Sequence, residues 1–494
     1  MSTEHLPIVV IGAGPVGLAA AAHLVKRGET PVVLEAGPEV GHNVRAWGHV
    51  RLFSPWRYVV DSAAASLLEP TGWQAPDAEA LPTGKQLVER YLVPLAATVQ
   101  LAPTLRLSTR VLSVTRQRRD KLKDTGRDTA PFVVTVLREG GREERIEARA
   151  VIDASGTYQT ANPLGASGVP ALGEAALATR IFYGIPDVLG AHRARYASRR
   201  VLVVGSGHSA FNALLDLAQL AREAPGTQVV WAFRRPEDDR RLFGGGGKDA
   251  LSARGDLGTR TRALVESGKV RLAPDFHLEA LEETAEGLVA SDGERRLPAV
   301  DEVVATTGFR PDLSLSRELR LSLDVSVEAP SALAPLIDPN LHSCGSVPPH
   351  GEAELRHPEY GFYVVGMKAY ARAPTFLLLT GYEQVRSVAA YLTGDVAAAR
   401  QVHLVLPETG VCSTDFREEA SACCAVEDSP RAASEGCAAG SCTSPSVAVA
   451  AREQAGGCCS SATSLAAPSN GQGDTPAAAA LPFLASTGAS SCCQ

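Results

Sequence analysis

Two glycine-rich segments of this chain have the spacing that brings backbone N–H groups against a phosphate. The first is GAGPVG, in which Gly12, Gly14 and Gly17 follow a short run of valine and isoleucine. Gly12 permits a tight turn, Gly14 lets the backbone approach a pyrophosphate, and Gly17 lets the next helix pack against the strand. Glu35 ends the following apolar run, where a carboxylate can accept a hydrogen bond from an adenosine ribose hydroxyl. The segment from 8 to 35 therefore predicts a dinucleotide site.

The second glycine-rich segment, GSGHSA, follows the apolar run at 201–204. Gly205 and Gly207 take the places of the first two glycines, and Ala210 replaces the third, a change that helix–strand packing tolerates. We assign Gly205, Gly207 and Ser209 to a second nucleotide. One chain with two such sites is expected to be a flavoprotein that takes hydride from a nicotinamide.

Two arginines, Arg234 and Arg235, follow the next apolar run, where Glu35 stands after the first segment. Guanidinium groups can bind a ribose 2′-phosphate through charge-assisted hydrogen bonds, so the pair favours NADPH over NADH. The alternative is a solvated basic loop, because the three acidic residues at 237–239 nearly cancel the charges of Arg234, Arg235, Arg240 and Arg241.

Two further segments run from an apolar strand into a glycine-containing turn. They are AVIDASGT at 150–157, which contains Gly156, and VVATTGF at 303–309, which contains Gly308. The order of the four motifs resembles that of the two-dinucleotide flavoproteins. This superfamily includes flavin-containing monooxygenases, N-hydroxylating monooxygenases and thioredoxin reductases. The resemblance covers about residues 6–400 and implies that Gly156 and Gly308 also border the cofactors.

The resemblance implies an α/β fold with two Rossmann-like dinucleotide-binding domains, in which the NADPH domain is inserted into the FAD domain. Residues 1–194 and 311–405 are expected to form the two parts of the FAD domain, and residues 195–310 the NADPH domain. A length of 494 residues agrees with two compact units and a tail. We expect the tail, residues 406–494, to be disordered because it cannot bury enough apolar surface.

Two expectations concern individual elements. The charge-dense stretch at 118–145 is interpreted as an exposed hairpin. The segments at 362–365 and 382–392 resemble the closing strand and helix of these flavoproteins. The helix would begin near Gly381 and point its positive end at the flavin, which favours the anion formed on reduction.

The cysteine distribution separates the branches of the superfamily. Disulfide reductases need a cysteine pair in the folded domains, whereas residues 1–343 contain no cysteine. Flavin-containing monooxygenases need no such thiols, because the flavin itself carries oxygen as a C4a-hydroperoxide. Half of their FxGxxxHxxxY motif is present at His192 and Tyr196, but Pro186 and Val188 stand in the other half. We predict an FAD- and NADPH-dependent monooxygenase acting on a small N, S or metalloid centre, with its catalytic residues unassigned.

Two segments outside the motifs could border the active site. One is basic and aromatic, and could line a flavin or substrate pocket or pack a domain interface: Arg45, Trp47, His49, Arg51 and Trp56. The other is proline-rich, and we interpret it as a mobile loop over the active site rather than a metal site: His342, His350, Glu352, Glu354 and His357.

The tail holds nine of the ten cysteines, and six of them form adjacent pairs: Cys423, Cys424, Cys458, Cys459, Cys492 and Cys493. Adjacent thiols can bind a soft thiophilic centre such as a trivalent arsenical, mercury, copper(I) or zinc. The alternative is drift in an unselected tail, and a disulfide framework is not expected in a cytoplasmic chain. The cysteines also suggest a resemblance to the flavoprotein monooxygenases of bacterial arsenic-resistance clusters.

Charge and composition exclude some partners. The net charge of −7 and the scattered basic residues predict no nucleic-acid binding. The apolar run at 8–25 is broken by small residues, Pro15 and His23, so we predict no membrane segment and a cytoplasmic protein. A small-molecule substrate and oxygen are the expected partners, and the oligomeric state stays open.

Two other functions remain open. One is a flavin reductase that passes electrons to the tail thiols or to a thiophilic metal or metalloid. The other is a thiol-rich flavoprotein that binds such a centre or senses its own oxidation.

Overall fold

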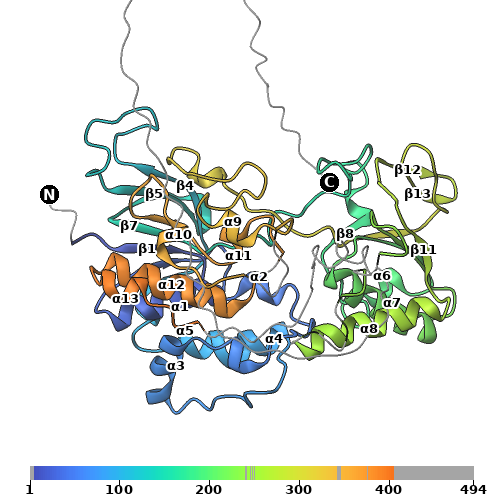
Figure 1. The fold of residues 1–494 in the computed structure, drawn as a ribbon, viewed down its shortest axis with the longest axis horizontal. Coiled ribbons are helices and arrows are strands. Elements are labelled where there is room, and N and C mark those ends of the chain that lie inside the picture. The colour runs from blue at the N-terminus through green and yellow to red at the C-terminus, as the bar shows by residue number, and fades with distance from the viewer. Residues whose placement is uncertain are drawn as a thin grey trace, which may run out of the picture. The chain divides into compact units, whose positions relative to one another are not determined.

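The computed structural model describes residues 5–239, 242–244, 246, 249, 251–341, 347–374 and 376–404. All ten cysteines of the chain lie outside these ranges, including the six predicted to bind a metal or metalloid. The prediction of a disordered tail also falls on residues outside the described ranges. Figure 1 shows the helices and strands.

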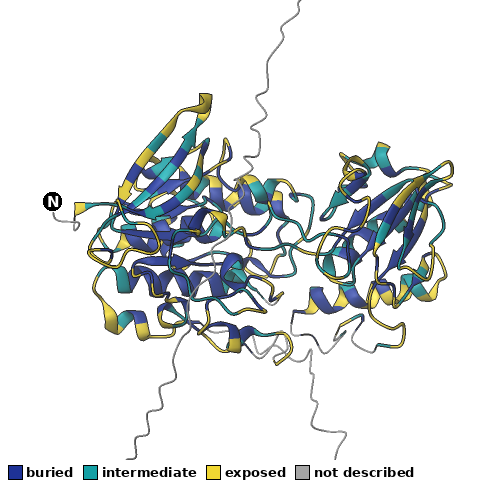
Figure 2. Ribbon diagram, turned by 90° about the horizontal axis from the view of Figure 1, so that it is seen from above, coloured by how far each residue is buried: buried dark blue, intermediate teal, exposed yellow. Residues whose placement is uncertain are grey.

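Valine- and isoleucine-rich runs form a five-stranded sheet in which every pairing is parallel, in the order β15, β7, β1, β2, β3. Its strands are β1 (Ile8–Ile11), β2 (Val32–Leu34), β3 (Leu105–Arg106), β7 (Ala150–Asp153) and β15 (Phe362–Val364). Every residue of β1, β7 and β15 is buried. Parallel strands covered on both faces need such continuous apolar runs. Figure 2 shows the buried residues gathered along the sheets.

Helix α1 (Pro15–Lys26) begins in the first glycine turn and contacts both β1 and helix α12 (Leu378–Leu392). Proline suits the first position of α1, because the N–H that it lacks would have no partner within the helix. The alanines at 19–22 are fully buried, and their small side chains allow close packing. Helix α12 starts at Leu378, earlier than the predicted start near Gly381. We call this sheet with α1 and α12 the first module.

A second five-stranded sheet is also parallel, in the order β11, β10, β9, β14, β8. Its strands are β8 (Ile181–Tyr183), β9 (Arg200–Val204), β10 (Gln228–Ala232), β11 (Arg271–Ala273) and β14 (Glu302–Ala305). Helix α7 (His208–Glu223) contacts β9, β10 and helix α8 (Ser252–Glu266). We call this sheet with α7 and α8 the second module. Because β8 belongs to it, the sheet begins before the predicted domain boundary at residue 194.

Two antiparallel sheets complete the strands. The three-stranded sheet consists of β4 (Thr109–Arg116), β5 (Phe132–Arg138) and β6 (Glu143–Ala148). The two-stranded sheet consists of β12 (Ala280–Thr284) and β13 (Gly287–Ser291). The predicted exposed hairpin at 118–145 is right only in part: β5 and β6 pair as antiparallel strands, but Phe132, Val134 and Val136 of β5 are fully buried rather than exposed. Alternation along β5 places these side chains on one face.

The remaining helices are short: α2 (His42–Arg45), α3 (Ser62–Leu68), α4 (Gly84–Leu87), α5 (Val93–Ala96), α6 (Arg193–Tyr196), α9 (Ala334–Ile337), α10 (Glu352–Leu355), α11 (Met367–Tyr370) and α13 (Val396–Arg400). The two parallel sheets with their helices confirm the predicted α/β fold with two Rossmann-like units. Within the described ranges, no helix has both the length and the apolar composition needed to cross a bilayer.

Candidate functional site

A cavity of about 320 Å³ lies where the turns after β1, β7 and β15 meet. Parallel strands present their carboxyl ends at the same edge of a sheet, so these turns come together although they are distant in sequence. Four predicted cofactor-binding residues line the cavity: Gly12, Gly14, Glu35 and Gly156. Most other lining side chains are apolar, among them Val16, Val44, Trp47, Leu52, Leu87, Phe309, Met367, Phe376 and Leu378. Such a wall suits a ligand with a large apolar ring.

The three glycines of the first turn have different surroundings. Gly12 has a φ of +97°, and a Cβ there would lie 2.8 Å from the carbonyl oxygen of Ala154. A Cβ at Gly17 would lie 1.9 Å from the carbonyl oxygen of Gly12, so helix α1 could not pack against β1 with a larger residue. A Cβ at Gly14 would meet no atom within 4 Å. Gly12 and Gly17 thus serve packing, whereas Gly14 leaves room for a ligand.

Glu35 is buried at the end of β2, with 9% of its surface exposed. Its carboxylate accepts hydrogen bonds from the backbone N–H groups of Ala13 and Gly37, each at 2.8 Å. An ionised carboxylate has about four acceptor positions, so two remain for a ribose hydroxyl. Glu35 therefore ties the first glycine turn to β2 and can still bind a nucleotide.

The second glycine turn repeats this geometry at the start of α7. Gly205 has a φ of +123°, and a Cβ there would lie 2.6 Å from the carbonyl oxygen of Thr306. Gly207 precedes the first residue of α7, and a Cβ there would meet no atom within 4 Å. Ala210 is fully buried, as expected for the small residue that replaces the third glycine. Ser209 lies in the first turn of α7, where free N–H groups favour an anion.

Gly308 lies beside the cavity of the first module. Its φ is +90°, and its carbonyl oxygen accepts a hydrogen bond from the N–H of Asn162 at 2.9 Å. The next residue, Phe309, stacks on Tyr158 with ring centroids 4.9 Å apart, and both rings line the cavity. The motif predicted Gly308 but not these two aromatic residues, since only the folded chain brings them together.

The two predicted 2′-phosphate arginines have different partners. Arg235 donates to the carboxylate of Asp239 at 2.7 Å. Arg234 donates to the carbonyl oxygen of Ala166 at 3.2 Å. Both side chains are exposed. Because Arg235 already has an anionic partner, Arg234 is the better candidate for a phosphate.

In the basic and aromatic segment from Arg45 to Trp56, one tryptophan borders the cavity and the other is buried in the core of the first module. Trp47 lines the cavity, whereas Trp56 is buried with 3% exposure and has the Arg90 guanidinium 5.9 Å from its ring. Burial lowers the pKa of His49. Asn43 also lines the cavity, and its amide oxygen accepts from the Gln159 amide at 2.5 Å.

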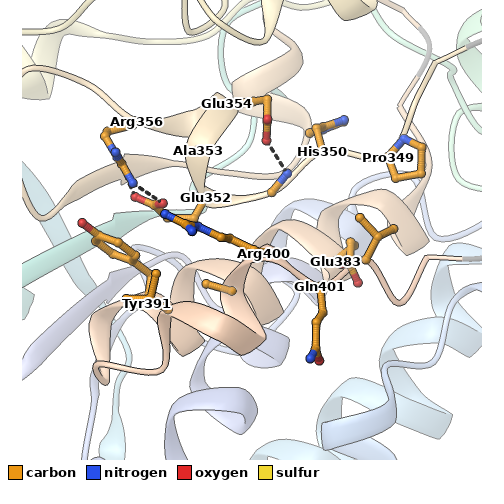
Figure 3. A pocket seen from close by; sticks show the side chains of 14 residues that line it. Pro349, His350, Glu352, Ala353, Glu354, Arg356, Glu383, Tyr391, Arg400 and Gln401 are labelled. Carbon is orange, nitrogen blue, oxygen red and sulfur yellow. Dashed lines mark hydrogen bonds and ion pairs between the residues drawn. The ribbon is translucent and has the colours of Figure 1, made fainter.

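The histidine-containing segment is not an exposed loop where the structure describes it. His350 and His357 are 2% and 4% exposed, and Glu352 accepts from both Arg356 and Tyr363. Figure 3 shows the Glu352–Arg356 contact beside a separate cavity of about 260 Å³. The interpretation as a mobile loop is therefore wrong for these residues, and His342 lies outside the described ranges. Among the described residues, no group of three metal-ligating side chains could hold an ion.

The half motif before the second glycine turn serves packing. Tyr196 is fully buried, and its hydroxyl has no hydrogen-bond partner among the described residues. The Nδ1 atom of His192 accepts from the backbone N–H of Asp187 at 3.0 Å.

Residues 9–331 match the family described as pyridine nucleotide-disulphide oxidoreductase, and the chain belongs to this family. The nitric oxide reductase FlRd-NAD(+) reductase of Klebsiella pneumoniae is 29% identical over 152 residues, which cover 30% of this chain and 35% of that protein. The chain thus matches about a third of this relative. A ferredoxin–NADP reductase of Salinispora arenicola is 28% identical over 326 residues, which cover 65% of this chain and 79% of that protein.

Two solved structures show the same fold at low sequence identity. The bacillithiol disulfide reductase Bdr of Bacillus cereus has a TM-score of 0.58 and 20% identity, covering 78% of this chain and 98% of that one. DfoA of Erwinia amylovora, a cadaverine monooxygenase bound to FAD, has a TM-score of 0.55 and 15% identity, covering 81% and 98%.

These comparisons confirm the predicted superfamily and the prediction of an oxidoreductase. The description of the family names a pyridine nucleotide, which agrees with the predicted nicotinamide cofactor. Reductases and monooxygenases both occur among the similar proteins, so the comparisons do not distinguish between these two reactions.

Proposed function

We propose that this member of the family is an FAD- and NADPH-dependent monooxygenase that oxidises a small N, S or metalloid centre. One observation favours oxygen over a disulfide as the electron acceptor. No cysteine is among the described residues that line the cavity, and the sequence has none before Cys344. A disulfide reductase of this architecture needs a cysteine pair beside the flavin. The described residues of the cavity wall include no such pair.

The first module offers the groups that FAD needs. The turn at Gly12 and Gly14 would hold the pyrophosphate, whose charge the N-terminus of α1 favours. Glu35 would accept a ribose hydroxyl with its remaining lone pairs, and Gly156 would border the cofactor on the β7 side. Leu378, the first residue of α12, lines the cavity, so the positive end of this helix would lie near the ring.

The second module offers a matching site for NADPH. Gly205 and Gly207 would hold its pyrophosphate, and Ser209 would contribute from the first turn of α7. Arg234 would bind the 2′-phosphate, and Arg235, whose charge is paired with Asp239, would contribute less.

The bound flavin supplies two-electron transfer between NADPH and oxygen. NADPH gives up a hydride, one oxygen atom forms a bond to the substrate, and the other leaves as water after taking up two protons, one of them from solvent. The residues of this chain would bind the two nucleotides and exclude water from the ring. Trp47, Leu52 and Leu87 provide the apolar wall for this exclusion.

The proposal is tested with isotopically labelled oxygen. The purified protein, FAD and NADPH are supplied with small sulfides, amines or trivalent arsenicals. We expect label in the oxidised product and NADPH consumption matched to product. NADPH oxidation that yields only hydrogen peroxide with every substrate, or turnover of a disulfide in the absence of oxygen, would contradict the proposal.

A reductase is the second candidate, because the family includes disulphide oxidoreductases by name and the fold is shared with a bacillithiol disulfide reductase. Electrons would then pass from the flavin to the tail thiols or to a thiophilic metal or metalloid. The cysteine pairs proposed to bind it are Cys423, Cys424, Cys458, Cys459, Cys492 and Cys493. Without turnover, the same pairs would make the protein a binder or redox sensor.

A further inference from the structure

A fully buried ion pair lies beside the cavity of the first module. Lys368, in α11, and Asp153, the last residue of β7, are 2% and 0% exposed, and their Nζ and Oδ2 atoms are 2.6 Å apart. Burying two charges costs free energy that their attraction often only offsets, so such a pair is weak evidence for a role in stability. The contacts of the pair with neighbouring side chains point to another role.

Ser155 is the neighbour that lines the cavity. Its hydroxyl donates to Oδ1 of Asp153 at 2.6 Å and accepts from Nζ of Lys368 at 3.0 Å. Its backbone N–H also donates to Oδ1 of Asp153, at 3.1 Å. A serine hydroxyl has one proton and two lone pairs. The proton and one lone pair are used, so the Ser155 side chain can only accept one further hydrogen bond.

This restriction selects the chemistry of the group that Ser155 can bind. A phosphoryl oxygen has no proton to give and cannot bond to the remaining lone pair. A hydroxyl or a ring N–H can. A free serine hydroxyl can donate or accept a hydrogen bond. Beside this ion pair, the Ser155 hydroxyl can only accept one from a ligand.

The strand order decides which half of FAD reaches Ser155. Glu35, the proposed ribose ligand, follows β2 on one side of the central strand β1. Ser155 follows β7, on the opposite side of β1. If the pyrophosphate lies over the turn after β1, adenosine extends toward β2. The ribityl chain and the ring must then extend toward β7 and β15.

We infer that Ser155, held by Asp153 and Lys368, is an acceptor-only position for a hydroxyl of the ribityl chain or a ring N–H of the flavin. The inference rests on the proposed FAD site and adds a ligand contact that the glycine motifs do not identify. Ser155 is the binding residue, and Lys368 and Asp153 are positioning residues.

The test compares FAD with ADP, which carries the adenosine and pyrophosphate but not the ribityl chain or ring. Apoprotein is titrated with each ligand, for the unmodified chain and for Ser155→Ala and Asp153→Asn. We expect Ser155→Ala to raise the Kd for FAD about 3- to 10-fold, the effect of one hydrogen bond, and to leave the Kd for ADP unchanged. Asp153→Asn should also raise the Kd for FAD. The amide N–H of the asparagine can donate to the Ser155 oxygen, which occupies the free lone pair and leaves the Ser155 hydroxyl proton without its acceptor.

Arg127 and Glu359 provide a matched control, since this ion pair is equally buried but has no hydrogen bond to a residue that lines the cavity. Glu359→Gln should alter neither ligand's Kd. Equal weakening of FAD and ADP by Ser155→Ala would overturn the inference, and so would no weakening of FAD. If Asp153→Asn fails to fold, Ser155→Ala alone decides. Failure of the unmodified protein to bind FAD would overturn the proposed function itself, which is a different result from normal FAD binding that is insensitive to Ser155.

Discussion

A methyl group would meet opposite surroundings at Gly14 and at Gly17, although both belong to the first glycine turn. A Cβ at Gly14 would meet no atom within 4 Å, and the φ of −81° is open to any residue. We therefore expect Gly14→Val to fold normally and to lose FAD, because the side chain would occupy the space proposed for the pyrophosphate. The visible absorbance of the purified variant measures its bound flavin.

The control for this variant is Gly17→Ala, whose Cβ would lie 1.9 Å from the carbonyl oxygen of Gly12. This change should lower the thermal midpoint of the apoprotein, since α1 must move away from β1. A Gly14→Val protein with full flavin absorbance would show that the pyrophosphate does not lie over this turn.

We expect recognition of the 2′-phosphate to depend mainly on the side chain of Arg234. We expect Arg234→Ala to raise the KM for NADPH about 10- to 100-fold, as the loss of a charged hydrogen bond predicts. The KM for NADH should not change, because that cofactor lacks the phosphate. Arg235→Ala should have the smaller effect, since Arg235 is paired with Asp239. Equal use of NADPH and NADH by the unmodified protein would contradict the assignment.

The sequence could predict those residues whose type is required by the local backbone conformation or by close packing within a motif. Gly12 needs a positive φ, Gly17 needs close helix packing, and each requirement leaves a glycine at a fixed place in a motif. Tyr158 and Phe309 have no such signature. They reach the cavity from separate turns, and their stacking depends on how the folded chain brings those turns together.

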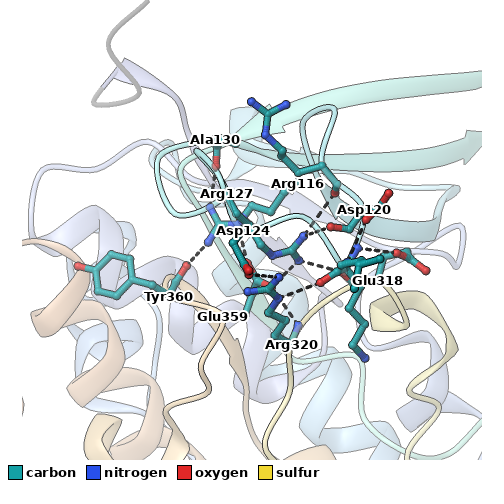
Figure 4. Close-up of polar contacts among 12 residues, drawn as sticks. Arg116, Asp120, Asp124, Arg127, Ala130, Glu318, Arg320, Glu359 and Tyr360 are labelled. Atoms are coloured by element: carbon teal, nitrogen blue, oxygen red, sulfur yellow. Dashed lines mark hydrogen bonds and ion pairs between the residues drawn. The ribbon is translucent and has the colours of Figure 1, made fainter.

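At the scale of elements, one buried carboxylate connects the three-stranded sheet to the segment that leads into β15. Glu359 accepts from Nε of Arg116 at 2.7 Å and from Arg127 at 2.6 Å, and it also accepts from the backbone N–H of Arg320. The three charged side chains are at most 3% exposed. Figure 4 shows these contacts converging on Glu359.

We expect Glu359→Gln to lower the free energy of unfolding by about 3–5 kcal/mol, because it leaves two buried guanidinium groups without a counter-charge. Burial alone would raise the pKa of Glu359, but hydrogen bonds from Arg127 and Arg116 outweigh it and lower the pKa. A lowered pKa means stability that is present at neutral pH and is lost as the pH falls below the ordinary glutamate value of about 4.3. Denaturant unfolding at neutral and acidic pH measures both effects. An unchanged pH dependence in the variant would contradict this account.

The elements that the sequence could predict are the central strands. β1, β7, β9 and β14 are short apolar runs that end in glycine turns, and only buried parallel strands need both signals together. β8 has only three residues, too few for a clear sequence pattern. Its place in the second sheet depends on its pairing with β14, which is distant along the chain. A boundary drawn from motifs alone therefore fell after β8.

At the scale of the whole molecule, the chain separates its cofactor residues from its thiols. Every residue proposed to bind FAD or NADPH directly precedes residue 310, and the described residues that line the cavity extend to Leu378, whereas nine cysteines follow residue 405. Two functions distributed in this way can be tested by a single truncation. Removing residues 406–494 deletes these nine cysteines without touching any residue of the proposed cofactor sites.

If the protein is a monooxygenase, the truncated chain should bind FAD, oxidise NADPH and transfer labelled oxygen to the substrate at the rate of the full chain. It should also lose tight binding of trivalent arsenic or mercury, which needs two or three convergent thiolates. A reductase that uses the tail predicts the reverse, with oxygen-independent turnover of a disulfide or a thiophilic metal that disappears on truncation. Oxygen transfer that is lost with the tail would count against the monooxygenase, because no cofactor residue has been removed.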